Sequence, residues 1–158
     1  AAYSLFFSHS KFDLQNPLEG ITILFDSEKQ NQSNQTIHID DIEITPEFLS
    51  YLLNEVGAWK LHKNPTTFEN PVINFRIDEQ NFYSEITNKI QTSEGSSEQA
   101  DIEFVIPKKD LVQAIISETP AQVFKQSIQD GNTQINTLAG EAELFAKGYL
   151  SLYDELKV

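Results

Sequence analysis

A series of closely spaced strand patterns constrains the fold of this chain more than any other feature. Apolar and polar residues alternate through Val72–Asp78, which is the period of a half-buried β-strand. Two further β-rich segments, Phe82–Thr87 and Ile90–Thr92, are separated only by a turn at Asn88–Lys89. Asp101–Ile106 returns to a strand pattern after a polar loop. Short connections of this kind predict an antiparallel sheet.

Helical patterns lie on both sides of these strands. A hydroxyl residue followed by proline, which is a common helix start, occurs at Thr45–Pro46 and at Thr119–Pro120. The segment Glu141–Leu156 has the spacing of one long amphipathic helix, with Phe145 on its inward face. Gly148 lies within that segment, where close packing or a nearby ligand would explain it. The predicted fold class is α+β, with an antiparallel sheet of about five to six strands covered by helices.

Three more segments complete the predicted organisation. Ile21–Phe25, Thr36–Ile44 and Thr133–Leu138 are rich in β-forming residues. The sequence contains no internal repeat and no linker-like segment after the first ten residues. We therefore expect an apolar N-terminal segment over residues 1–10 and a single α+β domain over residues 11–158.

The charge of the chain excludes several classes of partner. It carries 24 acidic residues against 11 basic ones, a formal net charge of −13. Nucleic acids and anionic lipid headgroups both require clustered Lys and Arg, so neither is an expected partner. Cysteine is absent, which excludes disulfides and thiolate chemistry.

The N-terminal segment leaves three interpretations open. The chain begins Ala-Ala-Tyr-Ser-Leu-Phe-Phe, and seven residues are too few to span a bilayer. They fit a processed end, the stub of a removed anchor or a first strand of a cytoplasmic protein. Sequons at Asn31 and Asn34 add weak support for an extracytoplasmic or cell-surface location, which we expect in preference to a cytoplasmic one.

The motifs of common enzymes and metal sites are missing. His38 and Asp40 are two residues apart, with Asp41 and Glu43 close by, and would face the same way on a strand as potential cation ligands. An exposed face of an acidic protein explains the same residues better, so no metal and no cofactor are expected. The chain has no nucleophile elbow, phosphate loop or dinucleotide fingerprint. The prediction is a protein that is not an enzyme, with a dispersed catalytic site as the last alternative.

From Val72 onward the layout resembles the sterol-carrier-protein family of lipid-binding domains. The likeness spans roughly residues 72–156 and is a pattern of residue types, not of invariant residues. It is carried by the strands named above, a helix at Lys109–Ile116, Gly131, the strand Thr133–Leu138 and Gly140 before the closing helix. In that family, an apolar tunnel between helices and sheet holds fatty-acyl or sterol-like ligands.

The resemblance implies a non-enzymatic domain that binds an apolar small molecule or lipid in a sheet–helix cavity, and the N-terminal segment adds the expectation that this domain is extracytoplasmic. The residues expected to line the cavity are Phe104, Leu111, Phe124, Phe145 and Tyr149. The alternative function is a structural or interaction subunit of the cell surface that assembles with copies of itself through its N-terminal strand. The residues expected to form that assembly strand are Tyr3, Leu5, Phe6 and Phe7.

Overall fold

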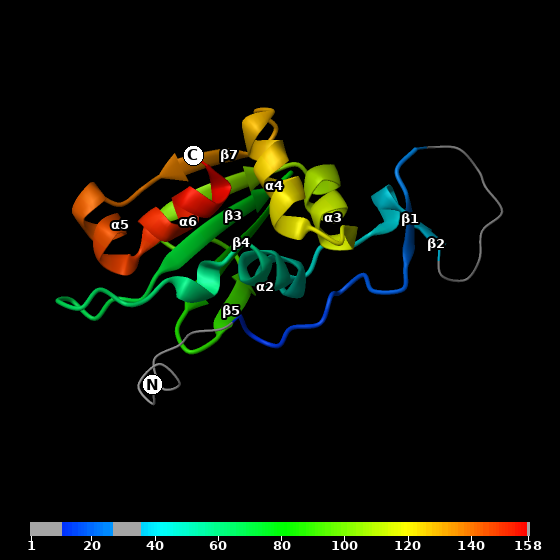
Figure 1. Ribbon diagram of the computed structural model, residues 1–158. Helices are drawn as coiled ribbons and strands as arrows, with labels where there is room; N and C mark the ends of the chain where they lie inside the picture. The colour runs from blue at the N-terminus through cyan, green and yellow to red at the C-terminus, as the bar shows by residue number, and fades with distance from the viewer. Residues whose placement is uncertain (1–10, 27–35, 158) are drawn as a thin grey trace, which may run out of the picture.

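The computed structural model describes residues 11–26 and 36–157. Its centre is a five-stranded sheet, with helices gathered on one face (Figure 1). The strands of this sheet are β3 (Val72–Ile77), β4 (Gln80–Ile86), β5 (Ile90–Glu94), β6 (Ile102–Ile106) and β7 (Gln134–Thr137). The helices are α2 (Pro46–Glu55), α3 (Lys108–Ile116), α4 (Pro120–Gln129), α5 (Glu141–Lys147) and α6 (Tyr149–Leu156). Short 3-10 turns form η1 (Ile39–Asp41) and η2 (Ala58–Lys60).

The large sheet is mixed. Its strand order is β5-β4-β3-β6-β7, and β3 pairs with β6 in parallel, with Phe75 opposite Phe104. The pairs β3–β4, β4–β5 and β6–β7 are antiparallel. The α+β class is therefore confirmed, whereas the expectation of a wholly antiparallel sheet is wrong at one pair. After β5, the loop of residues 95–101 carries the chain back across the sheet, so β6 lies beside β3 and not beside β5.

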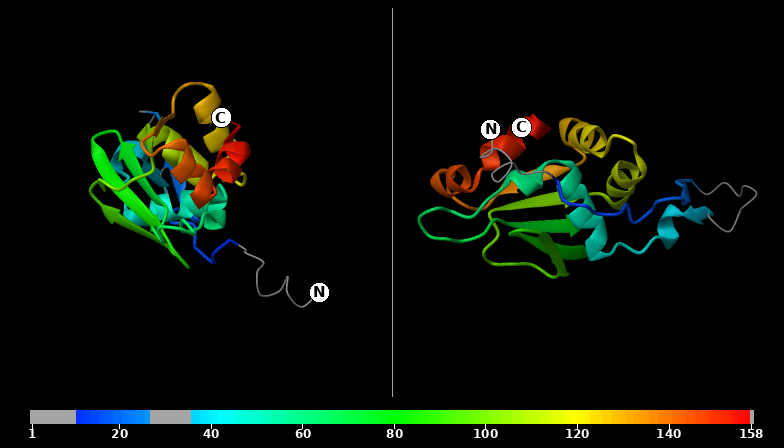
Figure 2. Two further views of the ribbon diagram at one scale, coloured as in Figure 1. Left: turned by 90° about the vertical axis from the view of Figure 1, so that its left-hand side faces the viewer. Right: turned by 60° about the horizontal axis from the view of Figure 1, so that its bottom comes forward.

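The core lies between the sheet and the helices that cover it (Figure 2). Ile73, Phe75 and Ile77 alternate along β3, as the sequence predicts, and each is at most 1% exposed. The rings of Phe75 and Phe104 stack with their centroids 5.6 Å apart. This face of the sheet is thus filled by aromatic and aliphatic side chains.

Both hydroxyl–proline pairs begin helices. Pro46 opens α2 and Pro120 opens α4, each at the first helical position. Neither preceding threonine makes a side-chain capping hydrogen bond. The helix starts therefore depend on proline and not on threonine. The proline ring presets the helical φ angle and has no N–H to satisfy.

The second of the predicted N-terminal strands is shorter than the sequence indicates. The strand expected over Thr36–Ile44 ends at His38, and the chain turns through η1 where Asp40 and Asp41 interrupt the apolar alternation. The strand β2 (Thr36–His38) pairs in parallel with β1 (Thr22–Leu24) in a small sheet of its own.

The C-terminal helix expected over 141–156 is broken in the middle. Gly148 adopts a left-handed backbone with φ +88°, which ends α5 and precedes α6. Glycine reaches this region without the steric cost that a Cβ imposes. The break corrects the expectation for Phe145, which faces outward with 71% of its surface exposed.

Candidate functional site

The five residues predicted to line an apolar cavity lie in two different environments. Phe104, Leu111 and Phe124 are buried in the core, and the rings of Phe104 and Phe124 meet edge to face at 5.3 Å. Tyr149 is also fully buried in this core, whereas Phe145 is exposed, and the two residues border one groove. The structure therefore buries four of the five predicted residues and leaves only Phe145 at the surface.

The groove runs along α5 and α6 and has a volume of about 750 Å³. Small-molecule sites in proteins commonly enclose ~300–1,000 Å³ and are lined mostly by apolar side chains. The residues that line the groove besides Phe145 and Tyr149 are Glu141, Ala142, Leu144, Leu150 and Tyr153. Its size and its lining therefore both suit an apolar ligand. We call it the α5–α6 groove.

Two side chains leave large apolar surfaces open to water at this groove. Phe145 of α5 is 71% exposed and Leu150 of α6 is 56% exposed. Because Gly148 breaks the helix between them, the two residues belong to separate helices that share one groove. The apolar wall is thus a product of the break, which the sequence pattern of one continuous helix does not predict.

The polar groups of the groove are few, and none of them is basic among the described residues that line it. Glu141 is the only charged residue among the described residues that line it. The hydroxyl of Tyr153 is buried and has no hydrogen-bond partner among residues 11–26 and 36–157. A buried hydroxyl without a partner loses hydrogen-bond energy that a ligand atom could restore. Among the described residues that line it, the groove therefore has one acidic side chain and no basic one.

Beside the groove lies a buried polar cluster centred on Asp101. One oxygen of the carboxylate, Oδ1, accepts a hydrogen bond from Lys147 Nζ at 2.8 Å. The other, Oδ2, accepts from Tyr149 Oη at 2.7 Å and from the Val72 amide at 2.9 Å. Lys147 Nζ also lies 3.0 Å from Glu143 Oε1. We call Asp101, Lys147, Tyr149 and Glu143 the Asp101 cluster.

The loop before β3 closes the Asp101 cluster. Asn64 donates through Nδ2 to Glu143 Oε2 at 2.8 Å, and the His62 amide donates to the Lys147 carbonyl at 3.1 Å. A Cβ at Gly148 would lie 3.2 Å from His62 Nε2, so the loop packs closely on the helix break. The loop, the sheet and both C-terminal helices are therefore joined at one place.

The protonation behaviour of the cluster follows from its contacts. Burial alone would lower the pKa of Lys147, but the hydrogen bonds to Asp101 and Glu143 outweigh it, so the pKa is raised. The hydrogen bond from Lys147 lowers the pKa of Glu143. Burial, and then the charge of Asp101, raise the pKa of Tyr149 well above its ordinary value. At neutral pH the lysine is charged and the tyrosine is neutral.

This cluster suits structural pairing better than catalysis. A lysine held as the ammonium ion has no lone pair for nucleophilic attack, and the carboxylate of Asp101 is occupied by three donors. Sequence reasoning missed the cluster. The available signal was weak: Lys147 follows Leu144 by three residues and so shares the buried face of α5.

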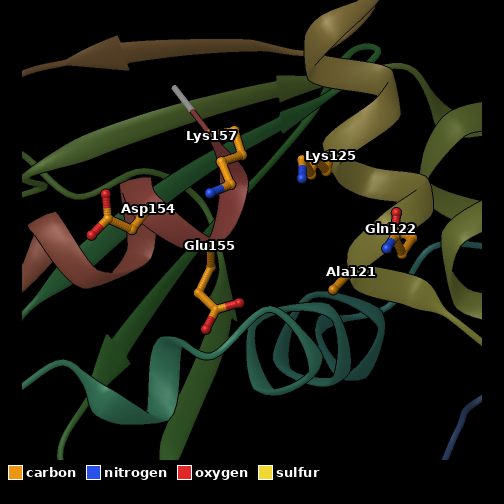
Figure 3. A pocket seen from close by; sticks show the side chains of 6 residues that line it. All are labelled: Ala121, Gln122, Lys125, Asp154, Glu155 and Lys157. Carbon is orange, nitrogen blue, oxygen red and sulfur yellow. The ribbon is translucent and has the colours of Figure 1, made fainter.

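A second hollow lies between α4 and α6, with a volume of about 360 Å³. Figure 3 shows Lys125 on α4 and Lys157 just beyond α6 on opposite sides of it. Asp154 and Glu155 also line it, and Glu155 is paired with Lys60 at 3.1 Å. Its positive and negative residues balance, and it therefore favours neither an anion nor a cation.

Of the candidate cation ligands near β2, His38 and Asp40 contact each other. His38 Nδ1 accepts a hydrogen bond from the Asp40 amide at 3.2 Å, and the other ring nitrogen contacts the Asp26 carbonyl. Within residues 11–26 and 36–157, no three His, Asp or Glu side chains gather closely enough to hold a metal ion. No helix in the described part of the chain has the length and apolar character needed to cross a membrane.

The predicted assembly strand lies outside the described residues. Tyr3, Leu5, Phe6 and Phe7 all precede Lys11, where the description begins. Assembly through this segment therefore stays a prediction. The large sheet does have edge strands, β5 on one side and β7 on the other.

Comparison with known proteins returns structures but no family. No protein-family model matches the sequence, and no curated protein matches it. Similar solved structures include a UbiJ-SCP2 ubiquinone synthesis protein, which is 13% identical with a TM-score of 0.37 over 68% of this chain and 91% of that one. Palmitated SCP2L2 from Aedes aegypti is 13% identical with a TM-score of 0.36, over 67% of this chain and 91% of that one. The sterol carrier protein domain 2 of Helicoverpa armigera is 18% identical with a TM-score of 0.38, over 74% and 96%.

Sterol carrier protein domains are therefore among the solved structures that this chain resembles, as the residues from Val72 onward predict. The TM-scores lie below 0.5. The likeness thus says nothing about what this chain binds.

Proposed function

We propose that this chain binds an apolar ligand of lipid or fatty-acyl type in the α5–α6 groove and performs no chemistry on it. The observation that carries the proposal is the groove itself, about 750 Å³ in volume, with Phe145 71% exposed on its wall. The site differs from the sheet–helix interior expected from the resemblance, because Phe104 and Phe124 pack against each other there.

The driving force would be the removal of apolar surface from water. Fully burying a Leu or Phe side chain contributes about 1.5–3 kcal/mol. Phe145 and Leu150 are both more than half exposed in the free protein, so much of this free energy is still available to a ligand. The buried hydroxyl of Tyr153 would fix one polar atom of that ligand by a hydrogen bond.

The polar groups near the groove support ligand binding without catalysis. The charged residues nearest the groove are tied to one another in the Asp101 cluster. Glu141 stands at the groove without an acid or base partner among its lining residues. General acid–base chemistry would need a second proton-transferring group within reach of the ligand.

A direct test uses the uncharged fluorescent probe N-phenyl-1-naphthylamine with the full chain. We expect a saturable rise in fluorescence, reversed by an unlabelled long-chain alcohol. Phe145→Asn and Leu150→Asn should each weaken probe binding by about tenfold, because each removes a large apolar contact. Both residues are exposed, so the variants should keep the stability of the parent.

Two matched controls locate the site. Phe68 is 67% exposed on the loop before β3 and does not line the groove, so Phe68→Asn should leave probe affinity unchanged. Trp59 lines a different groove of about 470 Å³, and Trp59→Phe should likewise bind the probe normally. Equal affinity in the parent and both groove variants would refute the site, and the absence of saturable binding would refute the function.

Location outside the cytoplasm is part of the same proposal, supported by the sequons at Asn31 and Asn34. Expression in a host that glycosylates such sequons tests it. A mobility shift that an N-glycosidase removes supports export, and exclusive recovery in the cytosolic fraction contradicts it. Assembly through Tyr3–Phe7 is tested separately, by comparing the oligomeric state of the chain with and without residues 1–7.

A further inference from the structure

We infer that Phe145 and Leu150 dock the α5–α6 groove onto an uncharged lipid surface, from which the groove takes its ligand. This inference rests on the proposed function and adds the partner that delivers the ligand. The partner is defined by its chemistry as a bilayer of zwitterionic or neutral lipid.

The first support is the placement of the exposed side chains. Only six large hydrophobic residues in the described part of the chain are exposed, and two of them line this one groove. Phe145 and Leu150 lie on separate helices on either side of Gly148. An apolar wall of this kind, open on the protein surface, marks a place of contact with another apolar phase.

The second support is the firm attachment of this wall to the sheet. The buried pair Lys147–Asp101 fastens the end of α5 to the start of β6 at 2.8 Å. Tyr149 begins α6 and holds the same carboxylate. Because this wall is already held in place, it loses little conformational entropy when it inserts into a lipid surface, and this favours binding.

The charges of the groove and of the whole chain indicate which kind of lipid surface the groove can bind. Glu141 lines the groove, whereas no Lys or Arg does so among the residues described there. The whole chain carries a formal charge of −13. Anionic headgroups attract basic segments, and an acidic protein is repelled by them. The wall is therefore suited to headgroups without net charge.

Tyr153 agrees with an interfacial position. It lines the groove and is partly exposed, and tyrosine rings favour the boundary between an apolar phase and water.

Sedimentation with lipid vesicles tests the inference on the full chain. We expect the chain to pellet with phosphatidylcholine vesicles and to bind several-fold more weakly when phosphatidylglycerol replaces part of that lipid. The double variant Phe145→Asn/Leu150→Asn should lose on the order of tenfold or more in vesicle affinity. Phe68→Asn, the matched exposed control, should pellet like the parent.

The outcomes separate this inference from the proposed function, because the probe titration contains no vesicles. Saturable probe binding without vesicle binding overturns the inference and leaves the function standing. Vesicle binding that rises with phosphatidylglycerol content, or that the double variant retains in full, also overturns it. A dimer in gel filtration that the double variant converts to monomer also overturns the inference, because the wall then binds a second copy of the chain. Vesicle binding without probe binding refutes the proposed function. The contact with the lipid surface then stands, but the transfer of a ligand into the groove does not.

Discussion

Lys147 Nζ lies 2.8 Å from Asp101 Oδ1, and the two side chains are only 2% and 3% exposed. A buried ion pair of this kind is costly to break, because removal of one partner leaves the other charge without compensation in a poorly solvated place. The pair joins two segments that are 46 residues apart in the chain. Much of the cohesion between the sheet and the C-terminal helices therefore depends on one lysine.

The first prediction concerns that lysine. Lys147→Met should lower the free energy of unfolding by about 3–5 kcal/mol, since it strands the Asp101 carboxylate in the core. Urea denaturation measures the loss. Lys60 serves as the control, because its pair with Glu155 is 40% and 49% exposed. Lys60→Met should cost at most about 1 kcal/mol, and equal losses in the two variants would contradict the role of burial.

The second prediction concerns pH. The pKa of Glu143 is lowered from its ordinary value of 4.5, chiefly by the hydrogen bond from Lys147. A lowered pKa contributes stability that is present above pH 4.5 and is lost as the pH falls through the folded-state pKa. Melting temperatures recorded across the acid range should therefore fall less steeply for Glu143→Gln than for the parent. Parallel curves for the two proteins would exclude this contribution.

The third prediction concerns the alkaline limit. Burial raises the pKa of Tyr149 above 10.0, and hydrogen bonds to Asp101 and Glu143 raise the pKa of Lys147 above 10.5 against the effect of burial. Both groups therefore bind their protons more tightly in the folded chain. Their stabilisation is complete below pH 10 and is lost as the pH rises through the folded-state values. Tyr149→Phe should flatten the alkaline fall in melting temperature, and an unchanged fall would show that Tyr149 does not contribute to it.

The fourth prediction concerns the helix break. Gly148→Ala places a Cβ in a left-handed backbone and 3.2 Å from His62 Nε2, so it should cost about 1–2 kcal/mol of stability and weaken probe binding. Gly131 has a similar φ of +81° but no neighbour within 4 Å of a Cβ. Gly131→Ala should cost about 1 kcal/mol and leave probe binding unchanged. A groove that binds normally in Gly148→Ala would show that the break does not shape it.

The fifth prediction concerns ligand selectivity. The groove has Glu141 at its wall and no lining Lys or Arg among the described residues. A long-chain alcohol should therefore displace the fluorescent probe at lower concentration than the carboxylate of the same chain length, because only the carboxylate is repelled. Glu141→Gln should narrow the difference. Tighter binding of the carboxylate by the parent would mean that a cation outside the groove reaches the ligand.

Local signals were enough to predict most of the elements. Proline after threonine marks the starts of α2 and α4, and the alternation of Ile73, Phe75 and Ile77 marks β3. These signals act within a few residues, and their meaning does not depend on distant partners. The fold class followed from their order.

The remaining features depend on contacts between distant segments. The parallel pairing of β3 with β6 is set by a return across the sheet that no local pattern encodes. Burial of Lys147 requires Asp101, which the sequence places far away. The groove depends on the break at Gly148, and glycine within a helical pattern is compatible with either continuation or an end. Of the predicted cavity residues, Phe145 and Tyr149 line the groove, but the inward orientation expected for Phe145 was wrong.

The separation of Asp101 from Lys147 also bears on how the chain is completed during synthesis. The ribosome produces β6 and its aspartate 46 residues before the lysine that neutralises it. Until Lys147 and then Tyr149 have left the exit tunnel, burial of that carboxylate beside the Val72 amide is unfavourable. A nascent chain truncated before α5 should therefore remain open to proteases and chaperones, and release from this vulnerable state should coincide with the emergence of the two C-terminal helices.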